Sequence, residues 1–207
     1  TSHKALDRFL ADKEYNISSG IVLDNEREVY TKGTNNILYS RYSETAVIRI
    51  NGGKLTNSTS GGQSIFVDNR YTYGPCTYIN GGEVTGNIVV GISKEFNITG
   101  GIINGDILIS KHASSTSATL GSLNITGGVI NGSVDMTLGK AATISGGKMD
   151  SVSCVEGQSM TVTGGVFKAQ VPSDVVGEGF YATSDVYDAE DADYPYTVVD
   201  EETYTVS

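Results

Sequence analysis

The chain of 207 residues is long enough for one domain, or for one domain with a short terminal extension. Glycine is the excess residue, with 26 copies, but no Gly-Xaa-Yaa period accompanies it, which excludes a collagen-like chain. No apolar run reaches the roughly 18 to 20 residues that a membrane-spanning helix needs, so we expect no membrane insertion.

The net charge of −10 is concentrated at one end of the chain. Residues 1–172 carry all 14 Lys and Arg and 14 Asp and Glu, whereas residues 173–207 carry the other 10 acids and no base. A body of zero net charge lacks the basic surface that nucleic acids require, so no nucleic-acid partner is expected. Calcium binding by the acidic residues of the tail is an open alternative, but a solvated acidic face is the simpler interpretation, and we predict no metal site.

Residues 1–16 are expected to form a helical cap at the N-terminal end of the domain. Leu6, Phe9 and Leu10 fall at helical spacing with charged residues between them. An amphipathic helix at this place would cover the end of a stacked sheet, where exposed strand edges favour aggregation.

A repeat organises residues 17–172. Each copy has a β-branched residue, a small polar residue, two glycines, any residue and then an apolar one. Six copies are present, and they begin at Ile50, Ile79, Ile98, Ile125, Ile144 and Val162. Repeats of this length are typical of proteins that are built from stacked coils.

The spacing of the copies predicts the size of one coil. The first glycines stand 29, 19, 27, 19 and 18 residues apart, so a plain coil has 18 or 19 residues and two coils carry insertions. Apolar and polar residues alternate around each glycine pair, as they do in β-strands. Because so short a unit cannot bury its apolar face alone, successive units must stack at the strand spacing of about 4.8 Å. The sequence therefore predicts an all-β parallel solenoid with glycines at its corners.

The candidate ligand-binding residues lie in or beside the first insertion, which falls within residues 57–76. Tyrosine rings stack on the apolar faces of sugars, while Asp, Asn and Arg side chains bond sugar hydroxyls. The candidates are Asp68, Asn69, Arg70, Tyr71, Tyr73 and Tyr78. The alternative is that these tyrosines pack on the solenoid and anchor the loop. The second insertion, residues 111–119, is a small polar loop, and loops grafted on a rigid scaffold commonly carry function.

Residues 173–207 are expected to close the C-terminal end as an acidic segment. The runs 194–199 and 204–206 alternate in the manner of short strands. The two cysteines, Cys76 and Cys154, lie about four coils apart, so we expect neither a mutual disulfide nor a zinc site.

Nothing in the sequence forms a catalytic motif. Cleavage of a glycosidic bond needs two carboxylates about 5 to 9.5 Å apart. Asp106 and Asp135 occupy nearby turns, but Asp106 aligns with Ser133 in the next coil, so no acidic column forms. His112 lies in a Ser/Thr-rich loop with no partner at a useful spacing. We therefore assign no catalytic residue, no metal ligand and no cofactor.

The repeated Ile-Thr-Gly-Gly-Xaa-Ile/Phe unit, with the ending from Val171 to Val199, resembles the glycine-rich parallel β-helix repeats of bacterial surface and adhesin-like proteins. The resemblance covers roughly residues 46–199. It implies a right-handed parallel β-helix, in agreement with the right-handed crossover rule. The motifs of β-helical galacturonan hydrolases (Asn-Thr-Asp, Asp-Asp, Gly-His-Gly and Arg-Xaa-Lys) are absent.

The expected function is that of a non-catalytic, secreted, adhesin-like or stalk module of a bacterial cell surface, which binds carbohydrate through inserted loops. Its expected partners are a glycan or a host surface protein, and its expected state is a monomer. A phage fibre or spike domain is the alternative function, and such a domain would form a trimer. A polysaccharide-cleaving β-helix enzyme is the third interpretation.

Overall fold

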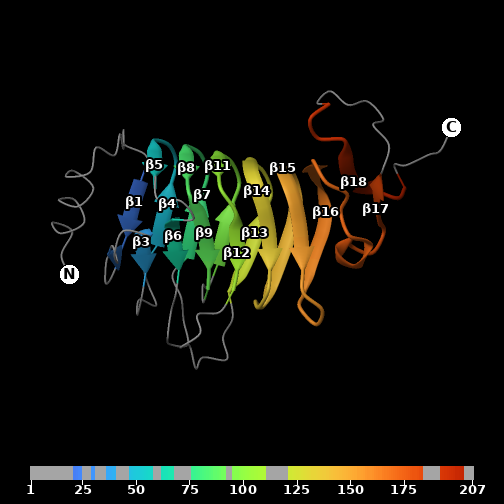
Figure 1. The fold of residues 1–207 in the computed structure, drawn as a ribbon, viewed down its shortest axis with the longest axis horizontal. Helices are drawn as coiled ribbons and strands as arrows, with labels where there is room; N and C mark the ends of the chain where they lie inside the picture. Colours follow the sequence, from blue (N-terminus) through green and yellow to red (C-terminus); the bar gives the residue numbers. More distant parts are fainter. Residues whose placement is uncertain are drawn as a thin grey trace.

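A computed structural model describes residues 21–24, 29–30, 36–40, 47–57, 62–67, 76–91, 95–110, 121–183 and 192–202. These residues form one strongly curled, mostly parallel sheet of 18 strands, and they contain no α-helix (Figure 1). The prediction of an all-β parallel architecture is confirmed. The predicted helical cap at residues 1–16 lies outside the described residues, as do residues 204–206.

The strands fall into three columns, to which successive coils add short strands or parts of one long strand. The first column contains β4 (Val47–Ile50), β7 (Cys76–Ile79), β10 (Glu95–Ile98), β13 (Ser122–Ile125) and the starts of β15 (Ala141–Cys154) and β16 (Met160–Phe167). The second contains β5 (Lys54–Thr56), β8 (Glu83–Thr85), β11 (Ile102–Asn104) and parts of β14 (Val129–Met136), β15 and β16. The third contains β3 (Asn36–Ser40), β6 (Gln63–Val67), β9 (Asn87–Val90), β12 (Ile107–Ile109) and the ends of β14 and β15. The long strands β14 and β15 run through the corners at which the earlier coils break.

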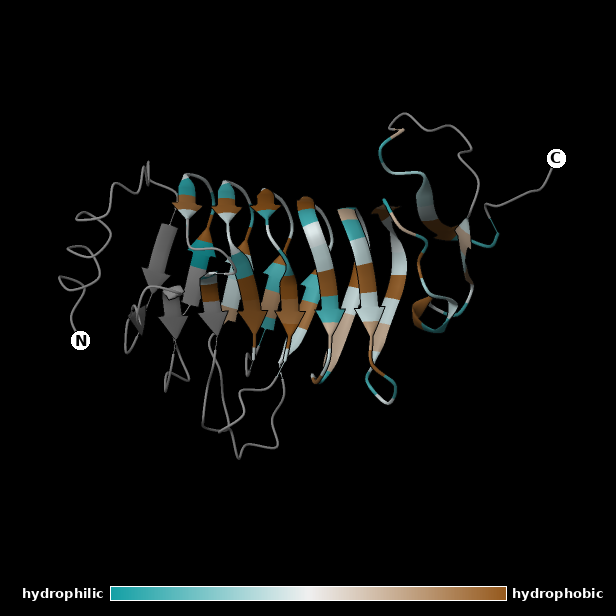
Figure 2. Ribbon diagram, viewed as in Figure 1, coloured by the Kyte–Doolittle hydropathy of each residue, from teal (hydrophilic) through white to brown (hydrophobic). Residues whose placement is uncertain are grey.

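Aliphatic ladders hold the coils together. The residues before each glycine pair, which are Ile50, Ile79, Ile98, Ile125, Ile144 and Val162, are at most 1 % exposed. Parallel registers such as Ile98↔Ile125 place like residues directly over one another. Figure 2 shows the resulting bands of hydrophobic residues, which continue from strand to strand. The core predicted from the repeat is therefore present.

Each of the two corner positions requires glycine for a different physical reason. A Cβ atom on Gly127, the first of its pair, would lie 2.6 Å from the backbone oxygen of Thr99 in the preceding coil. Gly128, the second, has a φ of 92°, which is strained for any residue with a side chain. The first glycine therefore permits close stacking of the coils, and the second permits the turn.

Antiparallel strands flank the stack at both ends. At the N-terminal side β1 (Ile21–Asp24) pairs with β4, and β2 (Val29–Tyr30) pairs with β3. At the C-terminal side β18 (Tyr196–Asp200) pairs with both β16 and β17 (Phe180–Thr183). Of the predicted closing strands, the one at 194–199 therefore forms, with bounds shifted to Tyr196–Asp200.

The C-terminal segment is fastened to the last coils by a short 3₁₀ helix and by an aromatic ring. The helix η1 (Ser173–Val175) buries Val175, and the neighbouring Val176 bridges to Val162 of β16. The ammonium groups of Lys148 and Lys168 lie 5.5 and 5.3 Å from the centre of the Tyr194 ring, within range of cation–π attraction. Lys168 also pairs with Asp150, whose Oδ1 lies 2.8 Å from the ammonium nitrogen.

Candidate functional site

Five of the six predicted ligand-binding residues, Asp68, Asn69, Arg70, Tyr71 and Tyr73, lie outside the described residues. The sixth, Tyr78, lies on the outer face of β7. The chain of the first insertion leaves the sheet at Val67, the end of β6, and returns at Cys76, the start of β7. Tyr78 therefore lies two residues from the point at which this insertion rejoins the stack.

Tyr78 is held by neighbours in the coils on either side. Its hydroxyl donates a hydrogen bond to Glu95 Oε2 at 2.9 Å, and the Arg49 guanidinium lies 5.2 Å from the centre of its ring. The hydrogen bond to Glu95, together with partial burial and the nearby Cys76 thiol, raises the pKa of Tyr78 to about 12. Tyr78 is thus a neutral, oriented ring on the outer face, which is consistent with either sugar stacking or a purely structural contact.

The two long insertions emerge from the same corner of the stack. One connects β6 to β7 and the other connects β12 to β13, so both run from the third column to the first. Plain coils turn here with few residues, as between β14 and β15. The amide of Gly121, just after the second insertion, donates a hydrogen bond to the carbonyl of Gly91 at 3.0 Å, which keeps the coils in register across the insertion. This corner, with the outer face of β7 beside it, is the first candidate site.

Asp106 and Asp135 approach each other through a serine. Ser133 Oγ lies 3.2 Å from Asp106 Oδ1 and donates to Asp135 Oδ2 at 2.5 Å. The Ser133 amide also donates to Asp106 at 2.9 Å, and Ser153 Oγ donates to Asp135 at 2.5 Å. The predicted alignment of Asp106 with Ser133 is confirmed. Both carboxylates accept hydrogen bonds from neighbouring coils, so they contribute to a polar ladder on the surface of the third column.

Asparagines form further ladders along the other columns. Asn124 donates to Asn97 at 3.0 Å, and Asn131 donates to Asn104 at 2.7 Å. Asn80 donates to Asn51 at 2.8 Å at the glycine corner. These side chains hydrogen-bond to one another between coils. Asn97, Asn124 and Asn131 each begin an Asn-Xaa-Ser/Thr sequence, and these hydrogen bonds give the asparagines a structural role.

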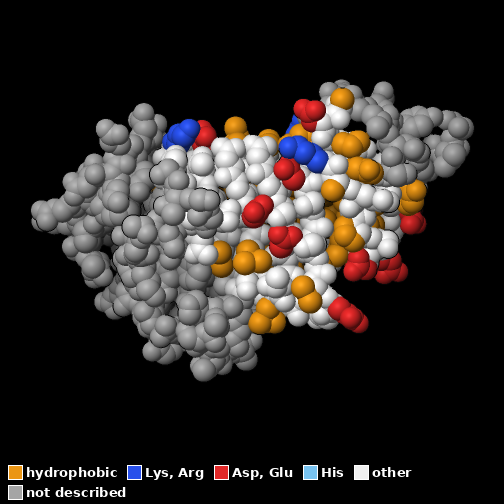
Figure 3. Space-filling model, in the orientation of Figure 1, with side chains coloured by type: hydrophobic (Ala, Val, Ile, Leu, Met, Phe, Trp, Pro, Cys, Tyr) orange, Lys and Arg blue, Asp and Glu red, His pale blue; other side chains and the backbone are white. Residues whose placement is uncertain are grey.

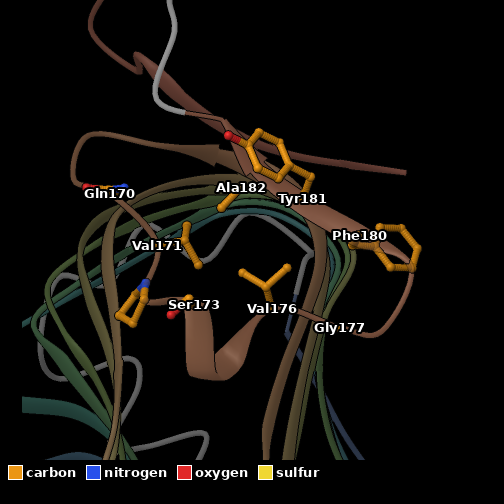
Figure 4. A pocket seen from close by; sticks show the side chains of 9 residues that line it. Gln170, Val171, Ser173, Val176, Gly177, Phe180, Tyr181 and Ala182 are labelled. Atoms are coloured by element: carbon orange, nitrogen blue, oxygen red, sulfur yellow. The ribbon is translucent and has the colours of Figure 1, made fainter. Parts of the chain in front are cut away.

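An open cavity of about 600 Å³ lies at the C-terminal end, where sequence reasoning placed no site. It lies between the segment 170–177 and β17 and is lined by Gln170, Val171, Pro172, Ser173, Val176, Gly177, Phe180, Tyr181 and Ala182 (Figure 4). The repeat ends before this segment, so no periodic pattern indicated how its residues would come together. The adjacent aromatic residues Phe180 and Tyr181 were the one signal available in the sequence.

Reactive groups are sparse in the described part of the chain. Both cysteines are free and half-buried, and burial raises the pKa of the Cys154 thiol, which keeps it protonated at neutral pH. Within the same residues no group of three or more His, Cys, Asp or Glu side chains is arranged to hold a metal ion. No helix among them is long and apolar enough to cross a bilayer.

Comparison of the chain with protein-family models, with curated proteins and with solved structures gives no match.

Proposed function

We propose that the chain is a right-handed parallel β-helix that serves as a non-catalytic, adhesin-like or stalk module at a bacterial cell surface, with inserted loops that bind carbohydrate. The observation that carries this proposal is the placement of both long insertions at one corner of a stack of coils in parallel register. In a scaffold of this kind the side-chain ladders hold the coils in place, and the loops inserted at the corner can differ in sequence and bind ligands without disturbing the coils.

The closed, right-handed form of the helix is supported by the three strand columns. Successive strands of one column are parallel and belong to successive coils, so each coil must pass through the other two columns before it returns. Crossovers between parallel strands of one sheet are right-handed in nearly all proteins.

The Tyr78 cluster supports carbohydrate as the ligand class. Arg49 and Glu95 fix the ring on the outer face at the base of the first insertion, and both charged groups are of the kind that bonds sugar hydroxyls. A pre-oriented aromatic ring loses little conformational entropy when a sugar stacks on it.

A glycan and polysaccharide binding screen tests the proposal, with the double variant Tyr71→Ala/Tyr73→Ala beside the wild type. We expect the wild type to bind at least one glycan and the double variant to lose at least about tenfold in affinity. Tyr181→Ala is the control, because Tyr181 is an exposed tyrosine at the far end of the stack. Loss of binding in the control, or equal binding by the double variant, would remove the first insertion as the site.

Absence of binding to every glycan would contradict the carbohydrate part and leave a stalk or assembly module, for which protein partners would be sought. Sedimentation equilibrium separates this module from a phage fibre or spike, since the adhesin-like module is expected to be a monomer and the fibre a trimer.

The bridge from Asp106 through Ser133 to Asp135 supports a second candidate, polysaccharide cleavage. One hydroxyl reaches both carboxylates, which is compatible with the separation of about 5 to 5.5 Å that retaining glycosidases use. Release of reducing ends from a polysaccharide panel, abolished by Asp135→Asn, would favour this enzyme over the display module.

A further inference from the structure

The C-terminal cavity has a preformed apolar floor. Val171, Val176 and Ala182 point toward the open space, and Tyr181 lines the rim with its ring turned away from these three side chains (Figure 4). Its volume of about 600 Å³ falls within the range of sites that accept small molecules or peptide side chains. The cavity therefore presents hydrophobic surface to solvent at a place where the coils end.

The floor is rigid because it belongs to the end of the core. Val171 is 3 % exposed, and Val176 forms a parallel bridge with Val162. The Gly177 amide donates to the Val162 carbonyl at 2.9 Å, and the Phe180 amide donates to the Gly177 carbonyl at 3.1 Å. A ligand would meet this surface already formed, which lowers the cost of binding.

Tyr181 contrasts with this floor, because 45 % of its surface is exposed. An exposed aromatic ring at the rim of an apolar cavity is a common anchor point in protein interfaces, and its face also attracts cations.

The charged residues beyond residue 168 are all acidic. Lys168 is the last basic residue of the sequence, and it is already paired with Asp150. Beyond it the described residues carry six carboxylates, at Asp174, Glu178, Asp193, Asp200, Glu201 and Glu202. Figure 3 shows carboxylates and hydrophobic side chains together at this end of the visible face. The local field therefore repels anions and attracts cations within about 8 to 10 Å at ordinary ionic strength.

We propose that this cavity is a docking site for a basic peptide segment of a partner protein, with one large apolar side chain in the cavity and flanking Lys or Arg against the carboxylates. A cation without an apolar group would leave the floor of Val171 and Val176 unused. An apolar or neutral ligand would gain nothing from the field. This site lies at the end of the stack, so the proposal goes beyond the carbohydrate-binding function of the insertion corner and does not depend on it.

Fluorescence polarisation with labelled hexapeptides tests the proposal on the full chain. The probe has the sequence Gly-Lys-Leu-Lys-Leu-Gly with blocked ends. Two matched peptides replace both Lys by Glu, or both Leu by Ser. We expect the basic apolar peptide to bind with a dissociation constant below about 1 mM. We also expect each matched peptide to bind at least about tenfold more weakly, and the affinity of the probe to fall as NaCl rises from about 50 to 300 mM.

Variants connect the binding to the cavity. We expect Tyr181→Ala to weaken binding of the probe at least about tenfold, and the double variant Asp174→Asn/Glu178→Gln to weaken it by about two- to fivefold. Ile102→Ala is the control for Tyr181→Ala, because Ile102 is 44 % exposed and lies in the middle of the stack. Glu156→Gln is the charge control, because Glu156 is exposed in the turn after β15.

Four outcomes would overturn the proposal. They are equal binding of the Glu peptide, unchanged affinity in Tyr181→Ala, loss of affinity in Ile102→Ala to the same extent, and no binding of the probe at 1 mM. Binding of a neutral oligosaccharide that Tyr181→Ala abolishes, without binding of the probe, would also reject it and assign the cavity to a sugar. The four outcomes named first do not bear on the Tyr71→Ala/Tyr73→Ala experiment, so the two proposals can fail separately, whereas sugar binding that Tyr181→Ala abolishes would contradict the insertion site as well.

Discussion

The environment of single side chains differs most from expectation at Tyr78. The sequence placed it beside an insertion, but its partner Glu95 follows 17 residues later in the chain, and only the register β7–β10 brings the two together. That register depends on how many residues each corner absorbs, which the repeat pattern does not specify for individual side chains. The column was predictable, whereas this hydrogen bond was not.

The ionisation of Tyr78 gives a measurable consequence of this contact. Since its pKa is raised from 10.0 to about 12, the folded protein favours the neutral phenol. The stabilisation is therefore full below pH 10 and is lost as the pH rises through 12. The absorbance of tyrosinate at 295 nm, wild type minus Tyr78→Phe, is expected to show a transition near pH 12 among the 12 tyrosines. Glu95→Gln should move it toward 10, and a transition already at 10 in the wild type would contradict the assignment.

Among the described residues of its column, Thr77 is the one inward residue that is polar, and its hydroxyl is buried without a hydrogen-bond partner. Its neighbours in register are Ile48 and Phe96. Replacing Thr77 by Val keeps the shape and removes the desolvated hydroxyl, so the free energy of unfolding is expected to rise by about 1 to 2 kcal/mol. Chemical denaturation measures this change. Thr126→Val, at an exposed corner, is the control and should stay within about 0.5 kcal/mol of the wild type.

Among the elements, the corners were the most predictable and the C-terminal segment the least. Each copy of the repeat has a β-branched residue, a small polar residue, two glycines and a later apolar residue in fixed order, and each position pairs with a similar residue in the next coil. The segment from η1 to β18 has no repeat, and its position follows from contacts such as Lys148 and Lys168 on Tyr194. These contacts join residues that are far apart in the sequence and belong to no common repeat. Neither η1 nor the cavity beside β17 was therefore predicted.

The corner glycines provide a matched test of how closely the coils stack. Gly127 and Gly52 occupy the same position of two corners, but a Cβ on Gly127 meets the Thr99 oxygen, whereas no described atom lies within 4 Å of a Cβ on Gly52. Gly127→Ala is expected to lower the free energy of unfolding by about 1 to 3 kcal/mol through overpacking. Gly52→Ala should change it by less than about 1 kcal/mol. Equal costs in urea denaturation would mean that backbone conformation, not stacking, requires glycine here.

For the molecule as a whole, the decisive feature is the contrast between a repetitive, electrically neutral body and an acidic C-terminal end. Coils interact mainly with their neighbours, so the interior of the stack is protected by coils on both sides while the last coil needs another cover. Val171 and Val175 supply it, since they are 3 % and 2 % exposed although they lie beyond the last repeat. The charge beyond residue 172 adds repulsion between the ends of separate molecules, which disfavours edge-to-edge pairing.

A substitution that displaces Val175 from the last coil tests whether this residue protects the C-terminal end of the stack. Val175→Asp places a charge in the buried position of η1, so the helix is expected to leave Val162 and the edge of β16 exposed. We expect more self-association than in the wild type, visible in sedimentation velocity as a sedimentation coefficient that rises with concentration. Ser173→Asp adds the same charge at an exposed position of the same helix and should behave as the wild type. If the two variants sediment alike, the last coil is stable without η1, and the repeats themselves must protect their edge.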